Sequence, residues 1–456
     1  CCFMNEYKLS MYNLYLELDP NTLIIGNYLY DQFLVLDQKE NIEEFFKIKN
    51  SLGKGELVSC FKSRLFTALN NRQFIIDQCI DEWELAKNYQ QKEKYSEDRL
   101  ELTIIPTQNC NFACPYCYQS HVPSKMSDQV AKGIYKYIEN NISRFNSLYI
   151  NWFGGEPLLE YARITTMMRE IINICKENKK PVLAGITTNG YLLTQERMRE
   201  LLNCKVYDYQ VTLDGDAAHH NKQRPLKDGT GSYDIIVSNL KSIMQIQRRY
   251  NLVIRINIST LNCANLDDYA KAISDIVNGD PRITVLWHRV MDYGGKSILE
   301  NKSLIHDDAN ISTKAMSIGI EYGVKPYAEA LDKKKYMCEA CKKNSYILNY
   351  DGYIYKCSNM VDRADSASDS SIGYICDGQF VIDAAKEERW ISHEVKSKKC
   401  RECPIFPVCG HAVCPKRLEF SAESCLYDVD VVYEILKEDY REGKYPVFTE
   451  LINNRT

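Results

Sequence analysis

The sequence lacks a long apolar run, a dominant charge sign and an internal repeat. No stretch is apolar for the length that a bilayer requires, and no signal peptide precedes the first charged residues. Lys and Arg number 57 against 61 Asp and Glu, and the net charge of −4 gives no whole-chain preference for nucleic acid or an anionic membrane. We therefore expect a cytoplasmic protein with no nucleic-acid or membrane partner.

Cysteine, in contrast, is abundant, with 19 among 456 residues. Disulfide frameworks are typical of short secreted chains, whereas this chain is long and concentrates eleven of its cysteines in two clusters. We therefore expect metal-bound thiolates in a reducing compartment. The other eight cysteines are most simply small buried hydrophobic residues: Cys1, Cys2, Cys60, Cys79, Cys175, Cys204, Cys263 and Cys376.

Residues 1–86 predict a small winged-helix-like α+β unit. Strands are expected over 12–18 and 33–36 with turn residues between them, followed by helices near 41–49 and 55–69 and a short strand at 74–76. Residues 87–100 predict a charged linker or a solvated helix. Such a unit could bind an extended peptide at a sheet edge, or it could simply cap the rest of the chain.

From residue 101 strands alternate with helices. We expect strands at 102–105, 148–152, 182–187, 207–213, 253–259 and 283–288, with helices at 127–142, 159–178, 194–202, 232–250 and 265–277. Six strand–helix units predict an α/β fold, a partial (β/α)6 barrel of the TIM type over 101–330, whose site lies at the strand C-terminal ends. Residues 331–430 predict a metal-stapled domain with little core, and 431–456 a terminal helix and tail.

The first cysteine cluster is Cys110-x3-Cys114-x2-Cys117, just past the first expected barrel strand. Three thiolates on one loop can hold three corners of a four-iron cluster, and no fourth cysteine follows nearby, so one iron keeps an open position. The alternative is a zinc knuckle that takes its fourth ligand from elsewhere in the chain. The aromatic Tyr116 precedes the last cysteine.

This pattern resembles the radical S-adenosylmethionine (SAM) enzymes, which carry three cysteines at this spacing with an aromatic residue before the last. The resemblance implies that SAM binds the open iron through its amino and carboxylate groups. It further implies that an electron from the cluster cleaves SAM to a 5′-deoxyadenosyl radical, which abstracts hydrogen from a substrate.

Further motifs occur at the ends of the next barrel strands. Gly154 and Gly155 allow a close backbone approach, and the resemblance implies that Gly154-Gly155-Glu156 receives the amino group of SAM. Cofactor contacts are also expected from Tyr116, Asn189, Asp214 and Arg255, the last toward the SAM carboxylate. Turns at Asn189-Gly190 and Asp214-Gly215 and an ordinary ion pair for Arg255 are equally open interpretations.

Three other side chains in this region have simpler interpretations. His219 and His220 could act as acid–base groups, but a solvated loop is the preferred interpretation. Trp287 could touch adenine, but packing inside the barrel is favoured.

The second cysteine cluster resembles the SPASM extension, the C-terminal domain of radical SAM peptide-modifying enzymes, which carries two auxiliary four-iron clusters. Its eight cysteines match two sets of four; a zinc ribbon is the alternative. The resemblance assigns Cys400, Cys403, Cys409 and Cys425 to the outer cluster. It assigns Cys414 and Cys357 to the inner cluster, together with Cys338, with Cys341 or with both of these. The gap between Cys409 and Cys414 holds four residues where three are common.

The family resemblance implies a maturase of a ribosomally made peptide that installs a thioether or related cross-link. It implies three 4Fe-4S clusters, SAM, a precursor peptide with a leader, and an external reductant such as flavodoxin or ferredoxin. The alternatives are side-chain oxidation as in sulfatase maturases and a non-catalytic zinc-binding interaction protein. Ser358 follows Cys357 where the sulfatase maturases carry a basic carboxylate, which disfavours the first of these.

Overall fold

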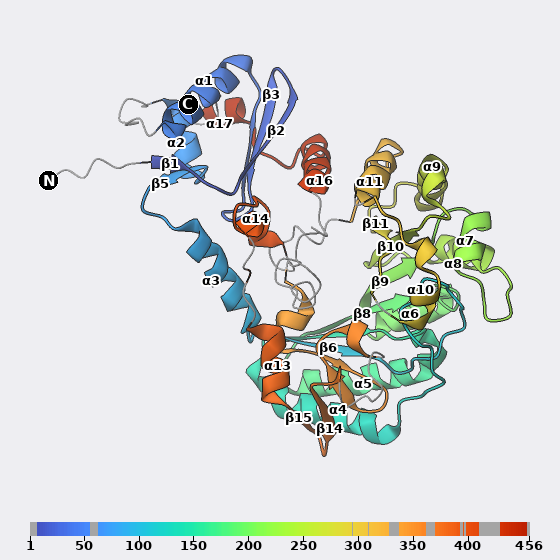
Figure 1. Cartoon of the computed structure of the whole chain (residues 1–456). Coiled ribbons are helices and arrows are strands. Elements are labelled where there is room, and N and C mark those ends of the chain that lie inside the picture. The colour runs from blue at the N-terminus through green and yellow to red at the C-terminus, as the bar shows by residue number, and fades with distance from the viewer. Residues whose placement is uncertain are drawn as a thin grey trace. The chain divides into compact units, whose positions relative to one another are not determined.

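The computed structural model describes residues 7–54, 63–293, 295–308, 310–327, 337–361, 370–392, 395, 398–409 and 429–453. The chain divides into two compact units (Figure 1). One unit combines residues 1–94, 328–338 and 393–456, and the other combines 95–327 and 339–392. None of the helices in the described part of the chain is long and apolar enough to cross a membrane.

The second unit is built on six parallel strands, as the sequence predicts. They are β6 (Arg99–Ile104), β7 (Ser147–Trp152), β8 (Val182–Thr188), β9 (Val206–Thr212), β10 (Asn251–Ile258) and β11 (Ile283–Arg289), and they are neighbours in this order. Each pairs in parallel with the next. The α/β class is confirmed, and the expected strand positions are correct to within about three residues at each end.

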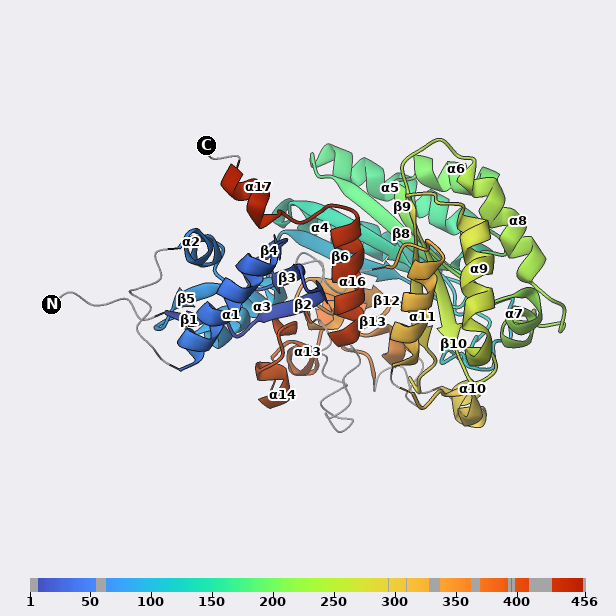
Figure 2. The same cartoon turned by 90° about the horizontal axis from the view of Figure 1, so that it is seen from above.

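Helices connect these strands by the crossovers that parallel pairing requires. The helices are α4 (Asp128–Asn141), α5 (Tyr161–Glu177), α6 (Gln195–Asn203), α7 (Ala217–Gln223), α8 (Tyr233–Met244), α9 (Leu266–Val277), α10 (Lys296–Glu300) and α11 (Ile311–Glu321). Figure 2 shows α5, α6, α8 and α9 along the outer side of the strands. The side chains of Ser127 and Thr194 accept hydrogen bonds from the amides of Val130 and Arg197, respectively. These two residues are therefore the N-caps at which α4 and α6 begin.

The sheet continues beyond the barrel strands, in a region where the sequence predicted little regular structure. β12 (Ser345–Leu348) pairs in parallel with β6, and β13 (Tyr353–Tyr355), β14 (Gly373–Cys376) and β15 (Gln379–Ile382) extend it antiparallel. Asp377 and Gly378 both have positive φ and join β14 to β15 in a two-residue hairpin loop. The prediction failed because these strands are only three or four residues long and show weak periodicity. The helix α13 (Ala384–Ile391) follows.

The first unit holds a three-stranded antiparallel sheet with the order β2 (Asn13–Asp19), β3 (Thr22–Asn27), β4 (Gln32–Leu36), and a pair formed by β1 (Tyr7–Leu9) and β5 (Ile75–Asp77). The helices α1 (Lys39–Gly53) and α2 (Arg64–Asn71) follow the sequence expectation, with 55–62 outside the described residues. The helix α3 (Glu82–Lys94) begins before the stretch 87–100 that was predicted as a charged linker or a solvated helix, and it buries one side of its surface, including Ala86 and Gln90. The sequence missed β3, which was assigned to turns. As the central strand it is buried on both faces and shows no alternation.

C-terminal elements complete this same unit. They are α14 (Lys398–Arg401), α16 (Val429–Arg441), as the sequence predicts, and α17 (Phe448–Asn453). Phe406 lies against Trp83 of α3, with ring centroids 4.7 Å apart. Short 3-10 turns occur in both units, at Ile142–Arg144, Pro157–Glu160, Cys263–Asn265, Lys302–Leu304, Glu339–Cys341, Ser358–Met360 and Phe406–Val408.

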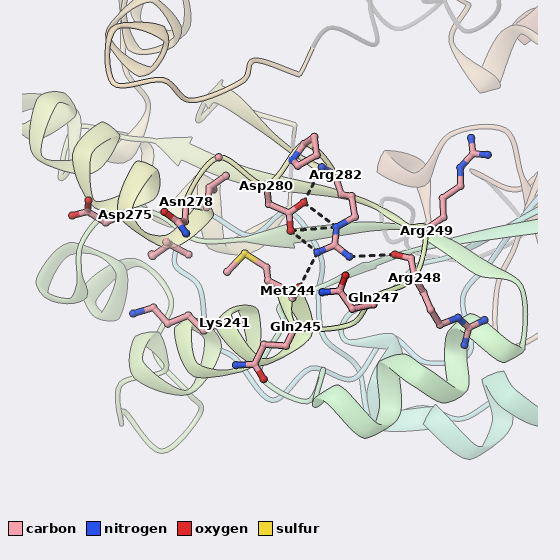
Figure 3. A pocket seen from close by; sticks show the side chains of 14 residues that line it. Lys241, Met244, Gln245, Gln247, Arg248, Arg249, Asp275, Asn278, Asp280 and Arg282 are labelled. Atoms are coloured by element: carbon pink, nitrogen blue, oxygen red, sulfur yellow. Dashed lines mark hydrogen bonds and ion pairs between the residues drawn. The ribbon is translucent and has the colours of Figure 1, made fainter.

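A surface pocket of about 1070 Å³ lies beside the residues that precede β10 and β11 (Figure 3). Parallel strands point the same way, so the pocket is at the opposite edge of the sheet from the cysteine loop that follows β6. Arg282 lines this pocket. Its guanidinium donates hydrogen bonds to the carbonyl oxygens of Met244 (2.8 Å) and Ile246 (2.5 Å) and to Asp280 Oδ1 (2.9 Å). These contacts tie the end of α8 to the start of β11.

We predict that Arg282→Met destabilises the protein by ~2 kcal/mol, because the partly buried carbonyl oxygens of Met244 and Ile246 lose their charged donor. The midpoint of urea unfolding measures the change. Arg249→Met, on the exposed side of the same pocket, is the matched control and should leave the midpoint unchanged. Equal midpoints for the two variants would contradict the structural role of Arg282.

Candidate functional site

The three clustered cysteines lie on the loop after β6, at the C-terminal edge of the parallel sheet. Cys110 and Cys114 are buried, and Cys117 is partly exposed. The loop turns tightly: the amide of Phe112 donates to Cys110 Sγ (3.4 Å), and the amide of Cys117 to the Cys114 carbonyl oxygen (3.1 Å). This is the edge at which parallel α/β folds place their chemistry.

The environment of the cysteines suits a bound cation. Burial is the main cause that raises the pKa of the Cys110 and Cys114 thiols to about 12. A buried thiolate needs a compensating positive charge, which an iron–sulfur cluster supplies at its thiolate ligands. No three His, Cys, Asp or Glu side chains converge on one metal position within the described residues. A four-iron cubane does not require its cysteines to converge on one metal position, because each cysteine binds a different iron.

Gly154 and Gly155 pack against the backbone that leads into the cysteine loop. A Cβ on Gly154 would stand 2.3 Å from the Thr107 carbonyl oxygen, and one on Gly155 would stand 2.3 Å from that of Gln108. The Glu156 amide donates to the Asn109 carbonyl oxygen at 2.8 Å. Glycine at these two positions therefore lets the backbone after β7 pack closely against the residues that lead into the cysteine loop.

Glu156 is completely buried and already accepts hydrogen bonds from protein groups. Its donors are the Thr188 hydroxyl (2.7 Å) and the amides of Asn189 (2.7 Å) and Leu158 (2.9 Å). Burial raises the pKa of this carboxyl, and the three hydrogen bonds oppose that rise. A carboxylate has roughly four acceptor positions, so one remains for a further donor.

Asn189, at the end of β8, contacts the cysteine loop directly. Its side-chain amide donates to Asn111 Oδ1 at 2.8 Å. On the other side of the loop the Ala113 amide donates to the Pro225 carbonyl oxygen at 2.9 Å, and Phe112 forms a bridge with Leu226. Two separate segments therefore hold the loop in place.

Tyr116, Asp214 and Asn257 form a hydrogen-bonded network beside the cysteines, in which Asp214 and Asn257 are buried. The Tyr116 hydroxyl donates to Asp214 Oδ2 and accepts from Asn257 Nδ2 at 3.2 Å. The Asn257 amide donates to Asp214 Oδ1 at 2.7 Å, and Arg255 Nε donates to Asn257 Oδ1 at 2.9 Å. The structure thus brings together three of the residues that were expected to contact the cofactor: Tyr116 on the cysteine loop, Asp214 after β9 and Arg255 on β10.

Arg224 completes this network, and the sequence did not reveal it. It is 8% exposed, its Nη1 donates to the Tyr116 hydroxyl at 2.7 Å, and its guanidinium lies 5.4 Å from the Phe112 ring centroid. Its Nε has no hydrogen-bond partner among the described residues, which leaves a buried donor next to Cys114. An arginine in a polar loop is normally exposed, so no local pattern marks it as buried.

The preferred interpretation of His219 and His220 as a solvated loop is wrong. Both lie in α7, and His220 is fully buried. Its Nδ1 accepts from the Asp214 amide at 3.1 Å and its Nε2 lies 3.0 Å from Ser232 Oγ, while burial holds the pKa of this imidazole well below its usual value. Helix formation was missed because α7 has only seven residues. His220 is a neutral residue that positions Asp214.

Packing is confirmed for Trp287. The side chain is 6% exposed and lies against Gly319 of α11, where an added Cβ would be 3.0 Å from the indole ring. The glycine provides the space that the indole occupies.

The downstream cysteines divide between the two units. Cys341 is fully buried in the second unit, which also holds Cys357, while Cys338, Cys400, Cys403 and Cys409 belong to the first. Cys400, Cys403 and Cys409 pack around Phe406 against α3. Cys414 and Cys425 lie outside the described residues.

Tyr118 links the two cysteine systems inside the second unit. It follows Cys117, and its hydroxyl hydrogen-bonds the Ser358 side chain. Burial is the main cause that raises the pKa of this phenol well above its usual value, and the charges of Cys117 and Cys357 add to the rise. Cys357 and the first cluster therefore share one neighbouring residue.

The family model described as Radical SAM superfamily matches residues 104–272. This range runs from the end of β6 into α9 and includes the cysteine loop, Gly154-Gly155-Glu156, Asn189, Asp214 and Arg255. The chain contains a radical SAM domain. The domain implies a SAM-binding 4Fe-4S cluster, which agrees with the sulfur ligands and the buried donor described above.

Two curated relatives match part of the chain. It is 29% identical over 176 residues to mycofactocin maturase MftC of Mycobacterium tuberculosis (strain CDC 1551 / Oshkosh), which covers 38% of this chain and 41% of the relative. It is 25% identical over 215 residues to Fe-coproporphyrin III synthase of Methanosarcina barkeri, which covers 46% and 50%. The chain thus spans about half the length of these relatives, whose names indicate different products.

A solved structure shares the fold of this chain. Native anSMEcpe with bound AdoMet and Cp18Cys peptide superposes with a TM-score of 0.55 and 16% identity, over 78% of this chain and all of that one. At this identity the likeness shows the fold alone.

We predict that Gly155→Ala destabilises the protein by ~1–3 kcal/mol, because the new Cβ overlaps carbonyl oxygens of the cysteine loop. The displaced loop should also hold less iron after anaerobic reconstitution. Iron per chain and the thermal midpoint measure both effects. Gly53→Ala, whose Cβ would meet nothing within 4 Å, is the control. Equal iron content in the two variants would contradict the close packing inferred for Gly155.

Proposed function

We propose that this protein is a radical SAM maturase that modifies a ribosomally synthesised precursor peptide by installing a thioether or related cross-link. The observation that carries the proposal is the position of Tyr118, which directly follows Cys117 and hydrogen-bonds the side chain of Ser358, the residue after Cys357. A cysteine from the downstream set thus lies beside the radical SAM cysteines in one compact unit. The similarity to a maturase over 176 residues also supports a peptide substrate.

Cys110, Cys114 and Cys117 would hold the SAM-binding cluster. Gly154, Gly155, Glu156, Asn189, Asp214 and Arg255 would surround SAM, with Arg224 as a further cation next to the cluster. When bound, SAM and its cluster supply a radical that removes a hydrogen atom from a substrate. The hydrogen bond between Tyr116 and Asp214 would hold the cysteine loop against the end of β9.

Auxiliary clusters form the second part of the proposal. Cys400, Cys403, Cys409 and Cys425 would hold the outer cluster, and Cys414 with Cys357 and Cys338, Cys341 or both would hold the inner one. The packing of three outer cysteines around Phe406 supports this grouping, since their sulfurs belong to one apolar cluster. An external reductant, such as flavodoxin or ferredoxin, would supply electrons.

Ser358 favours cross-linking over sulfatase-type oxidation. It occupies the position after Cys357 at which that reaction uses a carboxylate as base, and its side chain bonds to the Tyr118 hydroxyl. A hydroxyl pair is a much weaker base than a carboxylate at neutral pH. The N-terminal unit would act as a winged-helix-like recognition element for the precursor's leader.

Iron content and SAM cleavage test the enzyme proposal. Anaerobically purified protein should contain about twelve irons per chain, as three cubanes require. Cys110→Ala should abolish cleavage of SAM to 5′-deoxyadenosine, because the cluster loses one of only three ligands. Cys175→Ala, a buried cysteine of α5 outside both clusters, should retain cleavage. Zinc in place of iron, or undiminished cleavage by Cys110→Ala, would reject the proposal.

The peptide product is tested by co-expression with a short cysteine-rich reading frame beside this gene. Mass spectrometry should find the peptide lighter by two hydrogens for each cross-link, and Cys110→Ala should leave the mass unchanged. Blocking the peptide thiols then distinguishes a thioether, which consumes one thiol, from desaturation, which consumes none. An unmodified peptide beside an enzyme that cleaves SAM would refute the peptide substrate alone.

A further inference from the structure

His121 contacts the most accessible of the three clustered cysteines. Its Nε2 atom forms a hydrogen bond 3.3 Å long with Cys117 Sγ, and its ring is half-buried. Cys110 and Cys114 are buried, whereas Cys117 is partly exposed. The imidazole therefore lies against the least protected cysteine of the triplet.

The backbone at His121 is in the left-handed region, with a φ of 52°. Residues other than glycine adopt this conformation uncommonly, although histidine tolerates it better than most. Such strain persists only where the surrounding structure imposes it, and it is concentrated at functional sites. Here the strained residue is also the one whose side chain contacts a cysteine of the triplet.

The segment after His121 is fastened to the residues that precede the cysteines. Thr107 Oγ1 donates to the Ser124 carbonyl oxygen at 2.7 Å, and the Gln108 amide donates to Ser124 Oγ at 2.8 Å. Residues 107–124 are therefore a loop that is closed at its base and carries both the cysteine triplet and His121. This closure restricts where the imidazole can lie relative to the cysteine sulfurs.

The chemistry of a bound thiolate fixes the direction of this hydrogen bond. A cysteine sulfur that binds iron carries no proton, so it can only accept. The imidazole must then carry a proton on Nε2 and donate it toward Cys117 Sγ. Hydrogen bonds to the sulfurs of an iron–sulfur cluster help to set its reduction potential, because a donor stabilises the negative charge that reduction adds. His121 is therefore placed to make reduction of the cluster easier.

We propose that His121 is a positioning residue of the radical-generating cluster, which donates a hydrogen bond to the Cys117 sulfur and raises the reduction potential of that cluster. The inference rests on the proposed function only for the assignment of the cluster to Cys110, Cys114 and Cys117, and it is independent of the substrate. The electron comes from the external reductant, and the imidazole keeps its proton throughout. Loss of the donor makes the cluster harder to reduce, so a given reductant supports slower cleavage of SAM.

The test is a redox titration of the full-length, anaerobically reconstituted protein, followed by electron paramagnetic resonance. His121→Phe removes the donor and should lower the ratio of reduced to oxidised cluster roughly tenfold at a fixed potential, which is ~59 mV for one electron. His121→Gln keeps an N–H donor and should restore part of this loss. Both replacements meet the same left-handed backbone, so the difference between them reports the donor. His306→Phe, at a half-buried histidine whose Nδ1 accepts from the Asp308 amide at 3.1 Å, is the control and should match the wild type.

A second measurement detects the hydrogen bond itself. In protein labelled with 15N-histidine, pulsed electron paramagnetic resonance of the reduced cluster should show a weak nitrogen coupling. This coupling should be lost in both His121 variants and retained in His306→Phe. Cys110→Ala identifies the signals that belong to this cluster, because they disappear with its ligand. A residue that only shaped the loop would give no nitrogen coupling.

The outcomes separate this inference from the proposed function. Equal potentials for the wild type and His121→Phe at equal iron content, or no nitrogen coupling in the wild type, would overturn the role of His121 alone. A wild type that holds no iron, or signals that persist in Cys110→Ala, would refute the assigned cluster and with it the proposed function. If His121→Phe fails to fold, the nitrogen coupling of the wild type and its loss in His121→Gln decide the result.

Discussion

The hydrogen-bonded group of Tyr116, Asp214 and Arg224 is the interaction on which the rest of the site depends. It joins the cysteine loop, the end of β9 and the segment after α7 through one phenol oxygen. Asp214 and Arg224 are buried and Tyr116 is partly buried, so the two charged groups need their partners: an unpaired carboxylate or guanidinium in this position would be strongly destabilising. The cysteine loop therefore has one position relative to the parallel strands.

The glycine pair after β7 supports the same loop from the other side. Its backbone contacts the residues just before Cys110, and Glu156 continues the connection to the end of β8. The residues after β7 and β8 are thus hydrogen-bonded to each other and to the cysteine loop. Contacts of this kind fix the position of the loop, which a site for a reactive cofactor requires.

Much of this architecture could be predicted because its signals are local. The parallel strands of the second unit are largely apolar runs of six to eight residues separated by amphipathic helices, and hydrophobic periodicity is recognised within a short window of sequence. The cysteine spacing and Gly154-Gly155-Glu156 are likewise contiguous in sequence. The failures are short or central elements: β3 is buried on both faces, α7 spans seven residues, and β12–β15 have three or four residues each.

The sequence by itself determined the order of the parallel strands and the place of the first cysteine triplet after a strand, and it predicted iron binding by that triplet. Only the tertiary structure decided that Arg224 is buried, that His220 is a neutral support for Asp214, and that Tyr118 touches Ser358. It also decided that residues 445–453 complete a sheet formed by residues 13–36. The physical reason is the same in each case. Burial and pairing depend on contacts between segments that are distant in the sequence, and no local sequence pattern indicates which distant segment a residue will contact.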